Sequence, residues 1–219
     1  MSSKAYYPLF ADLEGRRCVV VGGGLIAQRK VAMLLRCGAS VIVVSPAVTP
    51  KLSTYAQRGR IRHLSRRVRP GDLRGAWLVY AATDDQRINE QVYRTATRLR
   101  IFTNVVDQKP LCSFIAPAIF TRGSLTVAVS TGGVSPSLSK KIRDELAQRV
   151  GTEYMPLLRL LANLRGIAKR RLPHYEDRKR FFDQIVRGHV IELVRAGKRR
   201  EARAEALNLL TRYAGNGHR

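Results

Sequence analysis

Cysteine is scarce in this 219-residue sequence, which contains only Cys18, Cys37 and Cys112. The three have neither CxxC spacing nor a nearby histidine, which argues against a disulfide framework or a zinc site and fits a reducing cytoplasm. We expect all three to be small core residues. The four histidines also lack metal-ligand spacing, so the sequence predicts no permanent metal site.

Long apolar runs are missing as well. No stretch is long and apolar enough to cross a bilayer, and residues 1–8 lack the hydrophobic segment of a signal peptide. Hydrophobic residues nevertheless make up 45% of the chain and charged residues 26%, as in an ordinary globular protein. We therefore expect a folded cytoplasmic protein without a membrane partner.

Acidic side chains are few: 16 Asp and Glu stand against 40 Lys and Arg, a net charge of +24. Such a charge attracts polyanions, which include nucleic acid, acidic membranes and small ligands with many carboxylates. The basic residues are spread along the chain rather than gathered in a tail. A solvated surface with no partner explains the excess equally well.

Strand and helix patterns alternate between residues 16 and 106, which predicts a parallel, doubly wound α/β sheet. The expected strands are 17–21, 40–44, 60–64, 77–82 and 101–106, and the expected helices are 25–37, 50–57 and 86–98. Beyond Pro110 we expect strands at 113–115, 118–121 and 124–130 and helices at 136–150, 152–172, 175–187 and 198–213. The predicted domains are 1–112, a small α+β region at 113–150 and a helical domain at 151–219.

The turn after the first expected strand is rich in glycine. Gly22-x-Gly24-x-x-Ala27 is the dinucleotide-binding fingerprint in its Gly/Ala form. The first glycine permits a tight turn, the second lets a pyrophosphate approach the backbone, and the small third residue lets helix pack on strand. The pyrophosphate would lie on the free N–H groups of the helix start. We predict a Rossmann-type nucleotide site; the alternative is a glycine-rich turn that binds nothing.

The second expected strand lacks the acidic residue that usually binds the ribose hydroxyls in such sites. Its tip is Ser45-Pro46-Ala47, where Ser45 could hydrogen-bond a ribose. Lys51 is close enough in sequence to suggest a 2′-phosphate. The choice between NAD and NADP is open at this point.

Two further strand ends place polar groups where open parallel sheets bind ligands. In Ala81-Ala82-Thr83-Asp84-Asp85 the small residues leave room for a nicotinamide or a ribose, while the aspartates fit simple helix capping. Asn104-Val105-Val106-Asp107 ends the fifth strand. A carboxylate there can take a proton from a carbon acid or a pyrrole nitrogen, or bind a metal transiently. The alternative for Asp107 is an ordinary turn residue.

A loop rich in hydroxyls and glycines, Ser130-Thr131-Gly132-Gly133-Val134-Ser135, precedes the helix expected at 136–150. Backbone N–H groups and hydroxyls in such a loop bind carboxylates or phosphate. Ser137-x-x-Lys140 matches the SxxK motif of penicillin-recognising enzymes, but the other elements of that family are missing.

Together these segments resemble one family, the precorrin-2 dehydrogenase/sirohydrochlorin ferrochelatase module of siroheme synthase. They occur in family order over about residues 6–150, and a helical tail follows. The matching segments are Tyr7–Phe10, Val20–Gly24 with Ala27-x-Arg29-Lys30, Ala81–Asp85, Asn104–Asp107, Ser113–Pro117 and Val127–Pro136.

The resemblance implies a homodimer with a Rossmann domain, a central dimerisation region and a helical C-terminal domain. Members of this family oxidise precorrin-2 to sirohydrochlorin with NAD, and many then insert Fe²⁺ to give siroheme. By this resemblance Asp107 is the catalytic base and assists metallation as a transient ligand. The implied cofactor-binding residues are Gly22, Gly23, Gly24, Leu25, Ile26, Ser45, Pro46, Ala47, Thr83, Asn104 and Val105.

Precorrin-2 carries many carboxylates, so a basic crevice would concentrate it. The predicted substrate-binding residues are Arg122, Ser130, Thr131, Gly132, Ser135 and Lys140, with Lys141 and Arg143 as further candidate cations. Some relatives have serine at the position of Thr131, which leaves the role of its hydroxyl open. The sequence ends before the methyltransferase of fused relatives, so methylation is not expected.

Two alternatives remain at this point. One is a redox-sensing Rossmann regulator that binds nucleic acid, and the other is a chelatase that has lost hydride transfer. The first needs a helix-turn-helix or a basic reading helix. None stands out before residue 151, so we expect no nucleic-acid partner.

Overall fold

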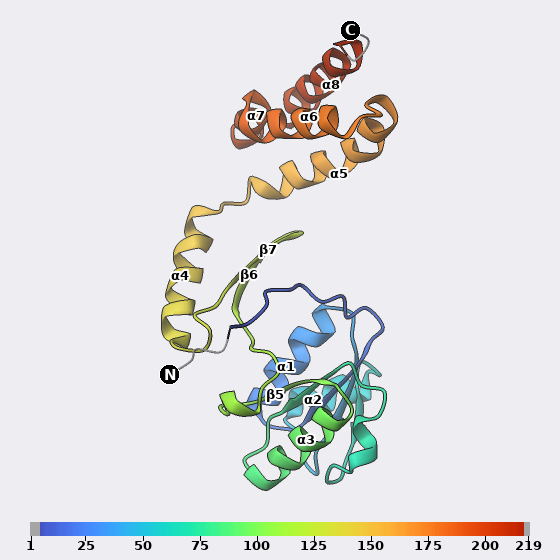
Figure 1. Ribbon diagram of the computed structural model, residues 1–219, viewed down its shortest axis with the longest axis vertical. Helices are drawn as coiled ribbons and strands as arrows, with labels where there is room; N and C mark the ends of the chain where they lie inside the picture. The colour runs from blue at the N-terminus through green and yellow to red at the C-terminus, as the bar shows by residue number, and fades with distance from the viewer. Residues whose placement is uncertain (1–4, 217–219) are drawn as a thin grey trace. The chain divides into compact units, whose positions relative to one another are not determined.

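The computed structural model describes residues 5–216 (Figure 1). The chain divides into two compact units. The first unit runs to Ala116 and includes Gly132–Val134, and the second contains Pro117–Thr131 and continues from Ser135. Each unit has a hydrophobic core of its own.

A five-stranded parallel sheet forms the centre of the first unit, in the order β3-β2-β1-β4-β5. Its strands are β1 (Arg17–Val21), β2 (Ser40–Val44), β3 (Arg62–Leu64), β4 (Leu78–Ala81) and β5 (Phe102–Val105). The strand order reverses between β1 and β4, and ligands bind such sheets in the crevice beyond the carboxyl ends of the strands at this point. The predicted parallel α/β fold is confirmed.

Helices cover both faces of this sheet. The central valines of β1 alternate between the faces, as strand geometry requires. Val20 packs in one core with Val31 of α1 (Leu25–Arg36) and Leu52 of α2 (Pro50–Gln57). Val19 and Val21 pack in the other core, which includes residues of α3 (Gln86–Arg98) and of the short 3₁₀ helix η1 (Pro70–Leu73).

The second unit begins with an antiparallel hairpin of β6 (Ala118–Arg122) and β7 (Leu125–Val129). Gly123 permits its tight turn with a φ of +61°. Helix α4 (Pro136–Arg149) packs against both strands. Four helices follow, which share a core around Phe181 and Leu210: α5 (Tyr154–Arg171), α6 (Tyr175–Arg187), α7 (His189–Arg195) and α8 (Arg199–Asn216).

The strand expected at Ser113–Ile115 is wrong. Ser113 does lie beside β5, but its side chain takes part in the pairing. The backbone N–H of Thr103 donates to Ser113 Oγ at 2.7 Å, and the backbone N–H of Ser113 donates to the Thr103 carbonyl at 2.8 Å. Because a hydroxyl accepts one of these bonds in place of a carbonyl, no ladder continues. A second 3₁₀ helix, η2 (Lys109–Leu111), precedes this segment.

The cysteine prediction is right for two residues and wrong for one. Cys18 and Cys112 are buried, and burial raises the pKa of the Cys18 thiol to about 11. Cys37 is exposed, because it ends α1 just before Gly38 turns the chain. Within residues 5–216, no helix combines the length and apolar character needed to cross a membrane.

Candidate functional site

The glycine turn after β1 contains two kinds of glycine. At Gly22, φ is +120° and a Cβ atom would collide with the Ala82 carbonyl. At Gly23, a Cβ atom would collide with the Ala47 carbonyl. Gly24 differs, because its φ is −78° and a Cβ atom would meet nothing within 4 Å. The packing of the protein requires the first two glycines, whereas the space at Gly24 fits the close approach of a pyrophosphate.

Helix α1 begins at this space. Among the described residues no side chain caps the helix, and its first turn contains no acidic residue. The first N–H groups of a helix have no partner within the helix. Those of Leu25 and Ile26 are therefore available to an anion, as the sequence predicts for a dinucleotide site.

The segment predicted to bind the ribose is Ser45–Ala47, which lies against the glycine turn. The backbone N–H of Thr49 donates to the Gly23 carbonyl at 3.0 Å, and Ser45 Oγ donates to the Ala47 carbonyl at 2.7 Å. Thr49 also caps α2, as its place before Pro50 indicates. Ser45–Ala47 contains no acidic residue, so the hydroxyl of Ser45 is the polar side-chain group of this segment that a ribose could contact.

The turn after β4 is fixed by a residue that sequence reasoning missed. Asn89, buried on α3, accepts a hydrogen bond from Thr83 Oγ1 at 2.9 Å and donates to the Thr83 carbonyl at 2.9 Å. A polar residue on the buried face of an amphipathic helix was the available signal. Asp85 caps α3 by accepting from the N–H groups of Arg87 and Ile88, so capping is confirmed for Asp85.

Asp107 lies at the same edge of the sheet as the glycine turn. The backbone N–H of Val106 donates to Ala81 and that of Ala82 donates to Val21, so the ends of β5, β4 and β1 are in register. Asp107 follows with an exposed side chain and a φ of +59°. A positive φ is uncommon for a residue other than glycine, and such strain is frequent in active sites.

Two buried residues support the end of β5. The side-chain amide of Asn104 donates to the Phe114 carbonyl at 3.0 Å, and Val105 is buried in the sheet. The amide therefore holds the segment after η2 against β5. This contact uses the amide nitrogen of Asn104.

Lys30 is the second residue that the sequence did not assign. Its ammonium lies 5.0 Å from the centre of the Tyr80 ring. Burial lowers the pKa of Lys30, the nearby Arg29 lowers it further, and Asp107 acts in the opposite direction. The charge of Asp107 therefore acts on the pKa of Lys30, a coupling that the sequence did not indicate.

The predicted substrate-binding residues belong mostly to the second unit. Thr131 Oγ1 accepts from the backbone N–H of Ser135 at 3.0 Å and lies 3.1 Å from Ser139 Oγ, while Ser135 caps α4. Arg122 is half-buried and donates to the carbonyls of Thr121 and Ala147. Gly132 belongs to the first unit, and Ser130 and Lys140 are exposed residues of the second.

The other two candidate cations are paired. Lys141 Nζ lies 3.8 Å from Glu145 Oε1, and Arg143 Nε lies 2.8 Å from Asp144 Oδ1. No three His, Cys, Asp or Glu residues in the described part of the chain are grouped to hold a metal ion. The structure thus gathers the predicted cofactor-binding residues with Asp107 in the first unit.

The fold and the glycine turn define a dinucleotide-binding α/β protein. The family described as "Putative NAD(P)-binding" matches residues 9–118. "Sirohaem biosynthesis protein central" matches residues 122–149, and "Sirohaem synthase dimerisation region" matches residues 153–210. The chain belongs to the NAD(P)-binding sirohaem biosynthesis proteins that these three models describe.

Curated proteins and a solved structure that are similar to this chain have names from siroheme synthesis. The chain is 42% identical to siroheme synthase of Methylobacillus flagellatus over 90% of its own length and 42% of that protein. It is 41% identical to siroheme synthase of Thioalkalivibrio sulfidiphilus over 90% of its own length and 40% of that protein. The chain therefore spans about two fifths of these curated relatives. A solved structure titled "SirC, precorrin-2 dehydrogenase" matches with a TM-score of 0.76 at 28% identity, covering 93% of this chain and all of that one.

Proposed function

We propose that this protein oxidises precorrin-2 to sirohydrochlorin with NAD. The observation that carries the proposal is the open space at Gly24, at the uncapped start of α1 and on the same sheet edge as Asp107. The name of the similar solved structure supports the substrate. The names of the curated relatives support a place in siroheme synthesis.

Each part of the site has a distinct task in this reaction. The N–H groups of Leu25 and Ile26 hold the pyrophosphate, and Ser45–Ala47 contact the adenosine ribose. Thr83, Asn104 and Val105 line the nicotinamide end. When bound, NAD⁺ supplies a hydride acceptor. The oxidation also releases a proton, which the carboxylate of Asp107 takes as general base.

Asp107→Asn tests this assignment directly. The amide cannot accept the proton, so turnover should fall by about 100-fold or more, in line with the usual contribution of a general base. The dissociation constant of NAD⁺, measured by calorimetry, should stay unchanged. Asp84→Asn is the matched control, because Asp84 is an exposed carboxylate that follows β4. Full turnover in Asp107→Asn would refute the role of the base.

We also propose Fe²⁺ insertion as a second activity and a homodimer as the working form. The relatives' name supports the first, and the family described as a dimerisation region supports the second. One anaerobic assay tests the chemistry: precorrin-2 and NAD⁺ are followed by absorbance, and Fe²⁺ or Co²⁺ is then added as substrate. Light scattering over a concentration series tests the dimer.

A further inference from the structure

We infer that Cys112 is a positioning residue for Asp107, because its thiol joins the two ends of the turn that contains this carboxylate. The inference rests on the proposed role of Asp107 as general base. Cys112 is only 4% exposed. It therefore acts through the backbone of the turn and not by contact with the substrate.

Asp107 lies in a β-turn directly after β5. The backbone N–H of Gln108 donates to the Val105 carbonyl at 3.2 Å and closes this turn. Asp107 is the third residue of the turn and has a φ of +59°. Glycine or asparagine is usual where a turn has a positive φ, and other residues keep such a backbone only where the surrounding structure holds it. The geometry of Asp107 therefore depends on contacts from outside the turn.

Those contacts come from the segment after η2. β5 is the last strand of the sheet, so one of its edges has no neighbouring strand among the described residues. The N–H groups along such an edge require other partners. The N–H of Thr103 donates to Ser113 Oγ at 2.7 Å, and the N–H of Val105 donates to Cys112 Sγ at 3.3 Å. Two side chains therefore bind the N–H groups that a further strand would bind.

The thiol of Cys112 contacts both ends of the turn. Its sulfur lies 3.2 Å from the Val105 carbonyl and 3.3 Å from the Gln108 carbonyl, and the S–H group can donate to either. Val105 is the first residue of the turn, and Gln108 is the last. Cys112 packs in the same core as Val21 and Ala81, the last residues of β1 and β4. The core of the sheet thus fixes the thiol, and the thiol fixes the turn.

Each contact of the thiol is weak, because sulfur is a weak donor and a weak acceptor. The effect on the reaction comes from the position of the carboxylate and not from the strength of these bonds. A displacement of about 1 Å can slow an enzyme by about 100-fold. A looser turn that moves Asp107 by part of this distance should therefore slow the proton transfer several-fold.

The experiment compares kcat, the KM for precorrin-2 and the dissociation constant of NAD⁺ in the full chain and its variants. In Cys112→Ala, kcat should fall by about three- to tenfold, while the other two constants should change by less than about twofold. In Cys112→Ser, whose hydroxyl donates and accepts, kcat should return to within about twofold of the unaltered protein. Serine is smaller than cysteine, so it would not repair a loss of packing alone.

Cys18→Ala is the matched control. Cys18 is also buried in the first unit, but it belongs to the core on the other face of the sheet. Its substitution removes the same sulfur atom, so it should lower the thermal unfolding temperature without changing kcat. If Cys112→Ala does not fold, Cys112→Val replaces it, because valine fills the space without a donor or an acceptor. Cys112→Val should then show the fall in kcat.

A double variant separates the inference from the proposed function. Because Cys112 acts through Asp107, Cys112→Ala should cause no further fall in kcat when Asp107→Asn is already present. An unchanged kcat in Cys112→Ala, or an equal fall in Cys18→Ala, overturns the inference and leaves the role of Asp107 intact. If Asp107→Asn itself keeps full turnover, the proposed function fails together with the inference.

Discussion

At the scale of single residues, we expect Gly22 to matter for the stability of the fold and Gly24 for the binding of the nucleotide. We expect Gly22→Ala to destabilise the protein by about 2–4 kcal/mol, because its φ and the Ala82 carbonyl both oppose a side chain. Gly24→Ala should cost at most about 1 kcal/mol at this helix start. It should nevertheless weaken NAD⁺ about tenfold or more by filling the space for the pyrophosphate. Denaturant unfolding and calorimetry measure the two effects, and unimpaired binding in Gly24→Ala would show that the space is not used.

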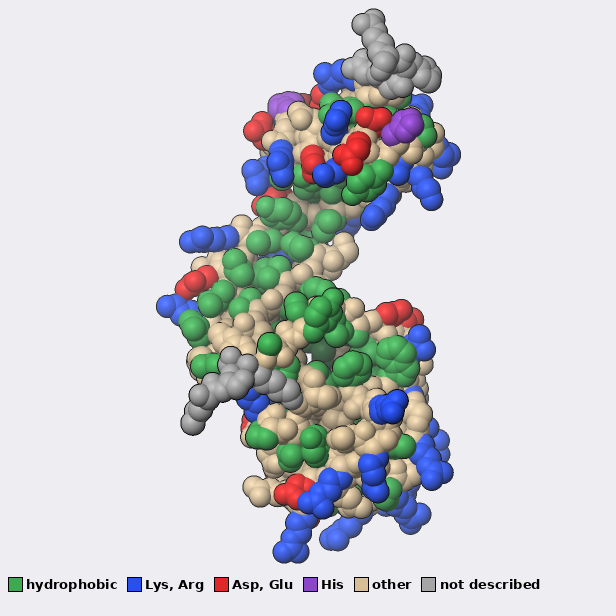
Figure 2. Space-filling model, viewed as in Figure 1, with side chains coloured by type: hydrophobic (Ala, Val, Ile, Leu, Met, Phe, Trp, Pro, Cys, Tyr) green, Lys and Arg blue, Asp and Glu red, His purple; other side chains and the backbone are tan. Residues whose placement is uncertain are grey.

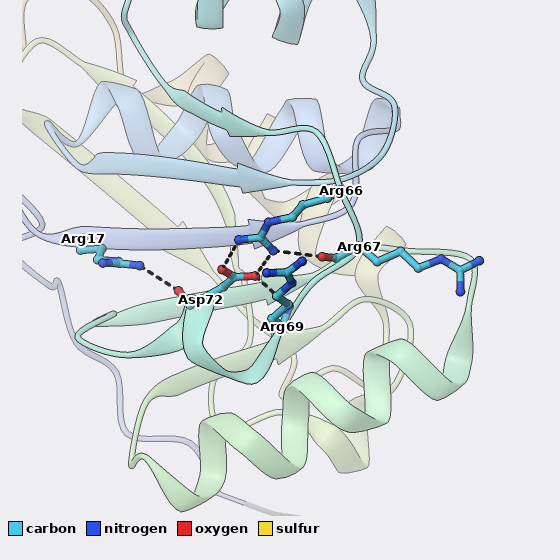
Figure 3. Close-up of polar contacts among 5 residues, drawn as sticks. All are labelled: Arg17, Arg66, Arg67, Arg69 and Asp72. Carbon is cyan, nitrogen blue, oxygen red and sulfur yellow. Dashed lines mark hydrogen bonds and ion pairs between the residues drawn. The ribbon is translucent and has the colours of Figure 1, made fainter.

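The ion pair of Arg66 and Asp72 gives a second prediction at this scale, because Arg66 donates to both carboxylate oxygens of Asp72, each at 2.7 Å (Figure 3). Hydrogen bonds from Arg66 hold the pKa of Asp72 below its usual range, and burial opposes the shift. A carboxylate with a lowered folded pKa stabilises the fold above its unfolded pKa, and this contribution is lost as pH falls through the folded value. Asp72→Asn should therefore destabilise the protein by about 1–2 kcal/mol at pH 7.

The difference between Asp72→Asn and the unaltered protein should shrink as pH is lowered from 5 toward 2, as measured by urea unfolding. Asp84→Asn is the control, because Asp84 is exposed and makes no ion pair within the described residues. A difference that stays constant over this range would contradict the assigned role of the ion pair.

Residue types that act locally could be predicted from the sequence, and those that act across the fold could not. The glycine motif and Asp107 are local, since each follows directly from a strand and its turn. The roles of Lys30 and Asn89 depend on residues that are distant or separate in the sequence. Lys30 lies over the ring of Tyr80, and Asn89 is hydrogen-bonded to Thr83 in the turn after β4. The sequence can mark Asn89 as a polar residue on a buried helix face, but it does not say which turn the side chain contacts.

At the scale of elements, the cap of α3 separates two neighbouring aspartates. Asp85 accepts two backbone N–H groups, whereas Asp84 contacts neither. We expect Asp85→Ala to destabilise the protein by about 1 kcal/mol, the usual effect of a lost N-cap, and Asp84→Ala to have little effect. Thermal unfolding measures both. Equal effects would mean that the cap does not stabilise the helix.

Helices and strands with a clear pattern of buried hydrophobic residues were predicted well, whereas short helices and strands were not. The valines of β1 are buried on both faces, which makes a central parallel strand the natural prediction. Helix α7 was missed because its seven residues follow Gly188 directly and span only two turns. Ser113–Ile115 has apolar residues typical of a strand, but the Ser113 hydroxyl replaces a ladder bond.

At the scale of the whole molecule, charge is the dominant feature. Lysine and arginine side chains are distributed over both units, and acidic side chains are fewer on the visible face (Figure 2). The net charge of +24 remains after all 16 acidic side chains have been counted against the 40 basic ones, so ion pairs do not reduce it further. A polycarboxylate substrate is attracted by this field from beyond contact distance, whereas a ligand of low charge is attracted much less.

Salt should therefore act on the two substrates unequally. Raising ionic strength from about 0.05 to 0.5 M shortens the Debye length from roughly 14 to 4 Å, which screens the exposed cations such as Lys140. We expect the KM for precorrin-2 to rise several-fold, with kcat nearly unchanged because Asp107 and its turn are set by the fold. The KM for NAD⁺ should change less, because we propose that backbone N–H groups at α1 hold its pyrophosphate. Sucrose at matched osmolality is the control for solvent effects. A KM for precorrin-2 that does not depend on salt would mean that the excess charge plays no part in substrate capture.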